Sequence, residues 1–268
     1  MNISKIYVQR AAIAAALTIL VPAASAFAAL TPNGITVVPR VTNTNPGSVL
    51  TITNSNSNPG NVTIDDRGFA AAGVNRHDAL ASLDGGATAY NFVAADSFTI
   101  SGTFMLTAGS NTPRKQVGLH AIGPAADRPR FMINSDAGEI AAFGGGLPFK
   151  SFSSGAQADY VPGTSITLGE IYRPNGGGAN GTIEYFIDRT PADGLLTGFE
   201  TSGPLLINNG AQLANFKLGI YTEFNTNLTV AATDFGNAVI TNLTVTTPEP
   251  ATLASLAIGG LMLRRRRA

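Results

Sequence analysis

The segment FTISGTFML, residues 98–106, decides the fold that we predict for this chain. Phe98, Ile100, Phe104 and Leu106 occupy alternate positions, and mostly Thr and Ser residues lie between them. A period of two places alternate side chains on opposite faces of a β-strand, one apolar and one polar. Related patterns predict further strands over residues 34–41, 49–53, 62–64, 117–122, 166–172, 183–187, 216–220 and 239–245.

Turn-forming residues separate these strands. The chain has 30 Gly and 15 Pro, and clusters such as Asn175–Gly178 lie between the apolar runs, as in the turns of antiparallel sheets. Helical periodicity is confined to residues 70–83, which could hold a helical turn or two. We predict an all-β antiparallel sandwich over residues 29–247, flanked by an N-terminal signal helix and a short C-terminal apolar helix. Because the chain has no Cys, a buried core must stabilise it.

The N-terminal residues have the three-part layout of a secretory signal peptide. Lys5 and Arg10 precede an apolar run over residues 11–21, which is short for a membrane span. Small residues follow in two overlapping small-x-small patterns, which a signal peptidase would cleave. We predict that residues 1–28 are a signal peptide for the export machinery, with an amphipathic or core helix as the alternative. The residues of the cleavage patterns are Ala24, Ala26 and Ala28.

The C-terminal residues 248–268 repeat this layout in reverse. Pro248, Glu249 and Pro250 precede an apolar run that, as a helix, would span about 20 Å against about 30 Å of hydrocarbon. An arginine cluster then stops transfer and stays in the cytoplasm. Both ends predict that the central domain lies outside the inner membrane, and an ordinary tail anchor is the alternative for this segment. The stop-transfer cluster consists of Arg264, Arg265, Arg266 and Arg267.

The order of Pro-Glu-Pro, a short apolar helix and an arginine cluster resembles the PEP-CTERM sorting signal of exported bacterial proteins. The resemblance implies that Pro248, Glu249 and Pro250 are recognised by an exosortase-type membrane enzyme. It also implies transient membrane anchoring, followed by release to the cell envelope, the cell surface or the extracellular matrix. Such a signal is an address and implies no activity.

The central strands carry a second resemblance, to the concanavalin A-like, laminin-G-type jelly roll. It implies a jelly-roll core over about residues 80–247, with residues 29–65 adding strands to the same sandwich. The segments that resemble this family are, in order, residues 83–86 (LDGG), Tyr90, residues 96–104 (DSFTISGTF), the pair 166–172 and 182–188, and residues 234–237 (DFGN) before the last strand.

Charge and hydropathy exclude two classes of function. Without the two terminal segments, 11 basic and 16 acidic residues remain, so residues 29–247 carry a net charge of about −5. A mildly acidic domain has no electrostatic reason to bind nucleic acid. The short apolar runs exclude a polytopic membrane protein.

No catalytic constellation is visible in the sequence. Glycoside hydrolases of the jelly-roll type carry Glu-x-Asp-x-x-Glu on one strand, and this run is absent. Glu184 and Asp188 come nearest, but four residues of strand separate them by about 13 Å, beyond the roughly 5–9.5 Å that glycoside hydrolysis requires. A carboxylate pair assembled across strands, for example with Glu170 or Glu223, stays open beside a set of solvated surface carboxylates.

The chain has two histidines and no Cys, which excludes a zinc site of the Cys/His type. His77 lies in the polar sequence NRHD and is predicted to occupy a loop, whereas His120 lies in the alternating segment 117–122. A Ser-His-Asp arrangement would need one of them. For His120 the alternatives are catalysis and a surface or satisfied core histidine.

Other ligands are weakly indicated. Tyr90, Tyr160 and Tyr172 could contact sugars if they are exposed, although the chain has no Trp. A structural calcium ion is the one cofactor that we consider, and any metal site is otherwise unknown. The carboxylates that could hold calcium near loops are Asp84, Asp96, Asp136, Asp188 and Asp234.

The sequence therefore predicts an exported, non-enzymatic β-sandwich protein of the cell surface or extracellular matrix, with extracellular polysaccharide as an optional partner and no catalytic residue. The alternative is a secreted glycan-active enzyme, resembling a glycoside hydrolase, whose carboxylates come together across strands.

Overall fold

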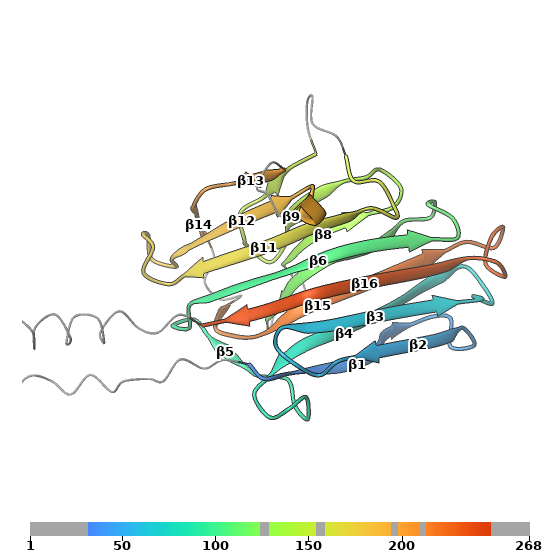
Figure 1. Cartoon of the computed structure of the whole chain (residues 1–268), viewed down its shortest axis with the longest axis horizontal. Helices are drawn as coiled ribbons and strands as arrows, with labels where there is room; N and C mark the ends of the chain where they lie inside the picture. Colours follow the sequence, from blue (N-terminus) through green and yellow to red (C-terminus); the bar gives the residue numbers. More distant parts are fainter. Residues whose placement is uncertain (1–31, 124–128, 154–158, 194–197, 209–212, 248–268) are drawn as a thin grey trace, which may run out of the picture. The chain divides into compact units, whose positions relative to one another are not determined.

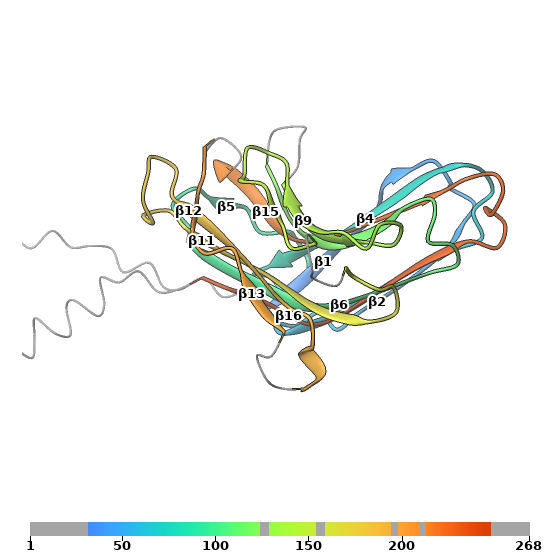
Figure 2. The same ribbon diagram turned by 90° about the horizontal axis from the view of Figure 1, so that it is seen from above.

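The fold is an antiparallel β-sandwich of two sheets, which confirms the predicted fold class at this level (Figures 1 and 2). Every strand pairing within the described part of the chain is antiparallel. A 3-10 helix covers Pro191–Asp193. The computed structural model describes residues 32–123, 129–153, 159–193, 198–208 and 213–247.

Two segments with predicted roles lie outside the described residues. They are the predicted signal peptide with Ala24, Ala26 and Ala28, and the predicted sorting segment 248–268 with its Pro-Glu-Pro motif and arginines. None of the helices in the described part has the length and hydrophobicity that crossing a bilayer requires.

The two sheets are here called sheet A and sheet B. Sheet A has the strand order β1 (Gly34–Asn43), β4 (Gly73–Ser82), β15 (Asn215–Thr226), β7 (Lys115–Ile122), β8 (Arg130–Asn134), β9 (Ile140–Phe143) and β10 (Lys150–Ser151), with β5 (Phe92–Val93) paired to β15. Sheet B has the order β13 (Phe199–Thr201), β12 (Thr182–Asp188), β11 (Ser165–Arg173), β6 (Phe98–Ala108), β16 (Phe235–Thr246), β3 (Gly60–Arg67) and β2 (Val49–Asn54), with β14 (Leu205–Leu206) paired to β12.

The core lies between the sheets and follows from the alternation in the sequence. On β6, Phe98, Ile100, Phe104 and Leu106 are all buried, as predicted. Phe216 of sheet A meets Phe98 across the core, with ring centroids 5.5 Å apart. Full burial of an apolar side chain of this size stabilises the fold by about 1.5–3 kcal/mol. A core built from both sheets can thus hold the domain together without disulfides.

Strand β4 corrects two predictions. Residues 70–83 do not form a helical turn, because residues 73–82 are a central strand that pairs with β1 and β15. His77 does not lie in a polar loop but is fully buried in this strand, with its Nε2 3.2 Å from Asp66 Oδ2. The misleading signal is the polar sequence around His77, whose side chains are satisfied by neighbours rather than by water.

Partway along strand β16, the positions whose side chains point into the core change by one residue. The pairing with β6 shifts register between Thr241 and Thr244, and Asn242 has a φ of 55°. This bulge puts Ile240 and Leu243 into the core, although they are an odd number of residues apart. The predicted apolar face, which counted every second residue from 239 to 245, is therefore correct only after the bulge.

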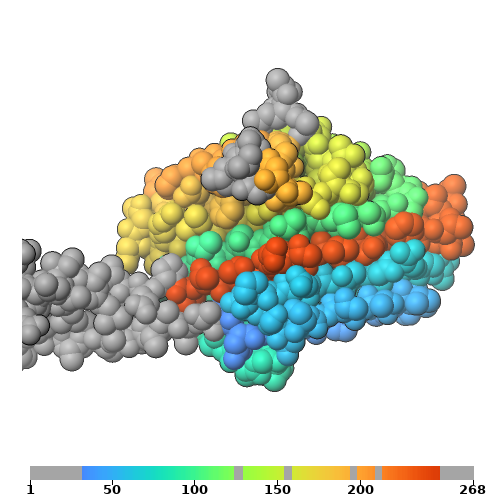
Figure 3. All heavy atoms as spheres, in the orientation of Figure 1, coloured from blue at the N-terminus to red at the C-terminus, as the bar shows by residue number. Residues whose placement is uncertain are grey.

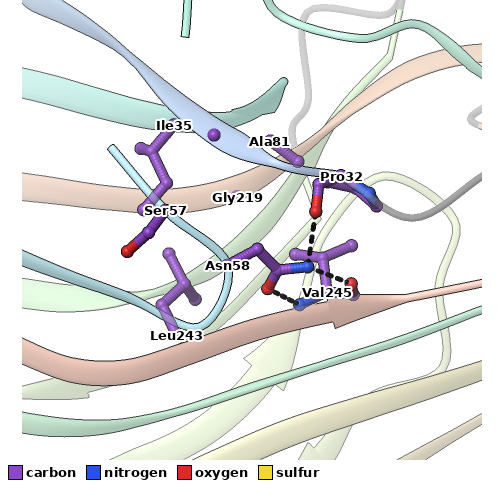
Figure 4. A pocket seen from close by; sticks show the side chains of 9 residues that line it. Pro32, Ile35, Ser57, Asn58, Ala81, Gly219, Leu243 and Val245 are labelled. Atoms are coloured by element: carbon purple, nitrogen blue, oxygen red, sulfur yellow. Dashed lines mark hydrogen bonds between the residues drawn. The ribbon is translucent and has the colours of Figure 1, made fainter. Parts of the chain in front are cut away.

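The first and last described residues lie at the same end of the sandwich. Asn58 joins them: its Nδ2 donates to the carbonyl oxygens of Pro32, at 2.7 Å, and Val245, at 2.8 Å. Its Oδ1 accepts the N–H of Val245 at 3.0 Å. Figure 4 shows this amide beside a small pocket that Ile35 and Leu243 also line. One side chain thus ties the N-terminal entry of the domain to its C-terminal exit.

Candidate functional site

The outer face of sheet B is rich in hydroxyl groups. In Figure 3 the strands of this face run side by side as bands. Thr103 and Thr167 are partly buried and share a hydrogen bond of 3.1 Å between their hydroxyls. Glu184 and Asp188 also belong to β12 of this sheet, where Glu184 accepts from Arg173 at 3.0 Å and Asp188 from the N–H of Thr190 at 2.9 Å. These two predicted carboxylates therefore have local structural partners.

The outer face of sheet A carries a different set of side chains, where β4, β15, β7 and β8 lie next to one another. Tyr221 stands opposite Asp78 on β4 and opposite Gly118 on β7. On the next strand, His120 stands opposite Arg130. The polar cluster, as we call it, consists of Arg76, Asp78, Gln116, His120, Arg130, Tyr221 and Glu223.

Strand geometry explains why the cluster faces away from sheet B. Along each strand its members alternate with core residues: Ala79 follows Asp78, Leu119 precedes His120, and Ile220 precedes Tyr221. Successive side chains of a strand point to opposite faces. The side chains of the polar cluster therefore leave the sheet on the side opposite the hydrophobic core.

Arg76 holds the centre of the polar cluster together. Its Nη2 lies 3.1 Å from His120 Nδ1, and its Nε donates to Asp78 Oδ1, also at 3.1 Å. His120 Nε2 lies 3.9 Å from the same Asp78 oxygen. Because a guanidinium group can only donate, His120 Nδ1 is the acceptor, and the hydrogen of a neutral imidazole is on Nε2.

Tyr221 lies between the arginines and the histidine. Its hydroxyl donates to Gln116 Oε1 at 3.1 Å, and its ring centroid is 5.6 Å from that of His120. The guanidinium carbons of Arg76 and Arg130 lie 5.4 and 5.2 Å from the centre of its ring. Burial raises the pKa of Tyr221 well above its ordinary value, although the two arginines oppose the effect. Tyr221 is therefore a proton donor throughout the neutral range.

The polar cluster has a buried part and an accessible edge. His120 and Tyr221 are fully buried. Arg130 and Glu223, whose side chains are 25% and 22% exposed, form an ion pair of 3.8 Å. Buried ionised groups are costly unless they are paired, and the pairs Arg76–Asp78 and Arg130–Glu223 meet this requirement.

Two glycines allow the strands to approach each other beneath the polar cluster. Gly118 lies opposite Tyr221, and Gly219 lies opposite His120. A Cβ at Gly118 would overlap the carbonyl oxygen of Phe131, and a Cβ at Gly219 would overlap that of Ala79. Both positions thus require glycine for close backbone approach rather than for an unusual φ.

Chemically, the polar cluster can move protons and bind an anion. It combines a neutral imidazole, a protonated phenol and two guanidinium groups within one patch. Histidine and tyrosine are common general acids and bases. Paired arginines bind carboxylates and stabilise negative charge as it develops.

The sequence prediction located part of this site. Glu223, one of the carboxylates that could pair across strands, lies in the polar cluster opposite Arg76 of β4. Glu170, the other carboxylate suggested for such a pair, does not lie there, because it points into the sandwich interior from β11 of sheet B and is 3% exposed. The missed signal was polar residues two or four positions apart on one face of each strand, namely Arg76 and Asp78, Gln116 and His120, and Tyr221 and Glu223.

The residues predicted for calcium or sugar binding do not assemble into one site. Asp84 bonds Ser82 and Thr88, Asp136 bonds Arg114, and Asp234 bonds Lys115. No group of three or more potential metal ligands occurs among the described residues. Of the tyrosines named as exposed sugar contacts, Tyr160 and Tyr172 are instead buried, with 5% and 2% exposure.

The sequence matches no known protein-family model and no curated protein. Solved structures of similar shape include a protein of unknown function from Shewanella oneidensis, with 11% identity and a TM-score of 0.43, covering 81% of this chain and 80% of that chain. An alginate lyase from Corynebacterium sp. has 12% identity and a TM-score of 0.45, covering 70% and 77%. The lectin-like defence protein arcelin-5 from Phaseolus vulgaris has 10% identity and a TM-score of 0.43, covering 81% and 100%.

These structures correct one prediction. Several of them are alginate lyases of polysaccharide lyase family 7, at 10–15% identity. The prediction of a non-enzymatic surface or matrix protein is contradicted by these matches, and the alternative of a secreted glycan-active enzyme is taken up only as a proposal. Because the likeness is one of fold, the case for catalysis rests on the side chains of this chain.

Proposed function

We propose that this protein is a secreted glycan-active enzyme that cleaves a uronate-containing polysaccharide by β-elimination. The observation that supports the proposal is the contact of His120 with Tyr221, at 5.6 Å between ring centroids, beside Arg76 and Arg130 on the outer face of sheet A. Burying ionisable groups costs free energy, and these groups lie outside the hydrophobic core, which does not need them to hold the sheets together. Such clusters are concentrated at functional sites.

The proposed reaction uses each of these side chains. A base removes the proton from the carbon next to the uronate carboxylate, and the glycosidic C–O bond on the following carbon breaks. A C=C double bond forms between the two carbons, and the departing oxygen takes up a proton. His120 is suited to accept the first proton and Tyr221 to donate the second. Arg76 and Arg130 are suited to bind the carboxylate and stabilise its developing charge.

Hydrolysis by two carboxylates fits the polar cluster less well. Asp78 and Glu223 lie on neighbouring strands, but each is the ion-pair partner of an arginine. A hydrolase needs one carboxyl that carries a proton for the leaving oxygen. The group in the polar cluster that keeps such a proton is the Tyr221 hydroxyl. β-Elimination is therefore the reaction class that we propose.

We also propose the finer fold and the cellular route that the sequence indicates. The sandwich would be a concanavalin A-like jelly roll. Signal peptidase would release residues 1–28, and an exosortase-type enzyme would act near Pro248, Glu249 and Pro250 before the protein reaches the envelope or the exterior. Mass spectrometry of the protein from its native cells tests this route, and an intact Met1–Ala268 chain would contradict it.

The activity is tested with the full chain and a panel of polysaccharides. Polymers of galacturonate, glucuronate, mannuronate and guluronate are incubated in parallel with neutral glucans. We expect cleavage of at least one polyuronate, with the ultraviolet absorbance of a conjugated double bond rising in step with new reducing ends. New reducing ends without this absorbance would indicate hydrolysis and contradict the proposed chemistry.

Two tyrosine variants provide a matched comparison. Tyr221→Phe removes the proposed acid, and we expect it to lower kcat by about 100-fold or more. Tyr172→Phe removes the hydroxyl of another buried tyrosine, which donates to the carbonyl of Ala94 at 2.7 Å, and should leave kcat unchanged. Equal activity in both variants would refute the assignment of the site.

A further inference from the structure

In this structure Arg76 blocks the nitrogen that the proposed base would use. Its Nη2 donates to His120 Nδ1 at 3.1 Å, and the imidazole hydrogen is on Nε2. While this hydrogen bond lasts, Nδ1 has no lone pair for a proton from a substrate. His120 can therefore act as a base through Nδ1 only after Arg76 moves.

A carboxylate of the substrate would supply the reason to move. Arg76 is 6% exposed, and its side chain has two hydrogen-bond partners in this structure. They are the carboxylate of Asp78, at 3.1 Å, and the neutral ring nitrogen Nδ1 of His120. A guanidinium bonds a carboxylate more strongly than a neutral acceptor, and it can do so with two parallel hydrogen bonds. Exchange of the His120 nitrogen for a substrate carboxylate is thus favourable for Arg76.

We propose that Arg76 is a substrate-operated latch on His120: binding of a uronate carboxylate draws the guanidinium from Nδ1 and makes that nitrogen available as the base. This inference rests on the proposed function. It makes the negative charge of the substrate a condition for catalysis as well as for binding. A sugar without a carboxylate would leave the latch closed.

The groups around His120 fit a link between carboxylate binding by Arg76 and the release of His120 Nδ1. Asp78 from β4, Tyr221 and Glu223 from β15, Gln116 from its own strand and Arg130 from β8 surround the pair of Arg76 and His120. Asp78 lies between the two partners, bonding Arg76 at 3.1 Å and lying 3.9 Å from His120 Nε2. It can hold the imidazole in place while Arg76 turns to the substrate.

Nitrogen NMR of the full-length chain tests the latch directly. The chain has two histidines, and His77 is an internal reference because its ring bonds other partners: its Nδ1 accepts the N–H of Arg40 at 3.0 Å, and its Nε2 lies 3.2 Å from Asp66 of sheet B. Oligomers of galacturonate, mannuronate or guluronate are added at saturation. We expect the His120 Nδ1 signal to move toward that of a ring nitrogen without a hydrogen bond, while His77 stays unchanged. An unchanged His120 signal with the oligomer bound would overturn the latch.

The methyl esters of the same oligomers sharpen the test. Esterification removes the charge but makes the proton next to the carboxyl group easier to abstract. Without a latch, loss of the charge would raise KM because the two arginines bind the carboxylate, but the kcat of the ester would be equal or higher. The latch predicts that the kcat of the ester is at least about 100-fold lower and that the ester leaves the His120 signal unchanged.

Variants separate the latch from the proposed function. Arg76→Lys keeps the charge but loses the paired donors, and we expect a higher KM, a kcat lower by about 100-fold and a His120 signal already shifted without ligand. Arg67→Lys, at the end of β3 in sheet B with its side chain 50% exposed, is the matched control and should change nothing. Cleavage that needs Tyr221 but is unaffected by Arg76→Lys would refute the latch alone. Absence of polyuronate binding would refute both.

Discussion

Removal of the buried carboxyl of Glu170 should change how stability depends on pH. Glu170 extends from β11 into the sandwich interior and is 3% exposed. Burial raises its pKa from about 4.5 to about 8. Burial also raises the pKa of the neighbouring Tyr185, and the charge of Glu170 adds to that effect. The perturbation is Glu170→Gln, which keeps the shape of the side chain and removes its titration.

The size of the pH effect on the free energy of unfolding follows from proton linkage. Between pH 4.5 and pH 8 the unfolded chain has released the proton of Glu170 and the folded chain still holds it. The folded state therefore binds more protons, and the free energy of unfolding falls as pH rises, by up to about 1.4 kcal/mol per pH unit. Over this window the loss amounts to roughly 5 kcal/mol. Above pH 8 both states are ionised and the contribution becomes constant.

Urea denaturation at a series of pH values between 5 and 8 measures the effect. We expect the stability of Glu170→Gln relative to the natural chain to rise by about 1.4 kcal/mol for each pH unit. Glu184→Gln is the control, because Glu184 lies on the outer face of β12 and bonds Arg173 and Thr201. A stability difference between Glu170→Gln and the natural chain that stays constant within about 0.5 kcal/mol over this range would show that Glu170 does not keep its proton in the folded state.

Three further predictions concern single positions. Lys115→Met leaves Asp234 buried without its partner at 2.6 Å, so it should cost about 3–5 kcal/mol in urea denaturation, and adding Asp234→Leu should restore most of the loss. Gly118→Val forces β7 away from β8, so we expect loss of polyuronate cleavage together with a lower Tm, and cleavage at the natural rate would contradict the role of this glycine. Asn58→Ala removes three hydrogen bonds between the ends of the domain and should lower stability by about 1–3 kcal/mol, with faster amide exchange at Val245 as the local sign.

Much of the fold could be predicted because period two is a local property. Strand β6 illustrates this, since the burial of Phe98, Ile100, Phe104 and Leu106 follows from their spacing alone. Two elements could not be predicted in this way. The bulge at Asn242 depends on the pairing of β16 with its neighbours, and the polar side chains of β4 are buried by partners from distant segments.

The site was harder to predict because it exists only through strand order. Arg76, His120 and Tyr221 belong to three strands that are far apart in the sequence and become neighbours in the order β4, β15, β7. The sequence showed His120 and Glu223 as isolated candidates, with nothing to indicate that they share a face. Polar residues two or four positions apart on one face of each of these three strands were the available signal.

The polar cluster on sheet A is the acid–base site that we propose for polyuronates. The most direct measurement is the kcat/KM of the full chain for polyuronate cleavage, followed by double-bond absorbance, in the natural protein and in Tyr221→Phe. We expect measurable elimination by the natural protein and a loss of about 100-fold or more in the variant. Absence of elimination with every polyuronate, or equal rates in the two proteins, would contradict this proposal.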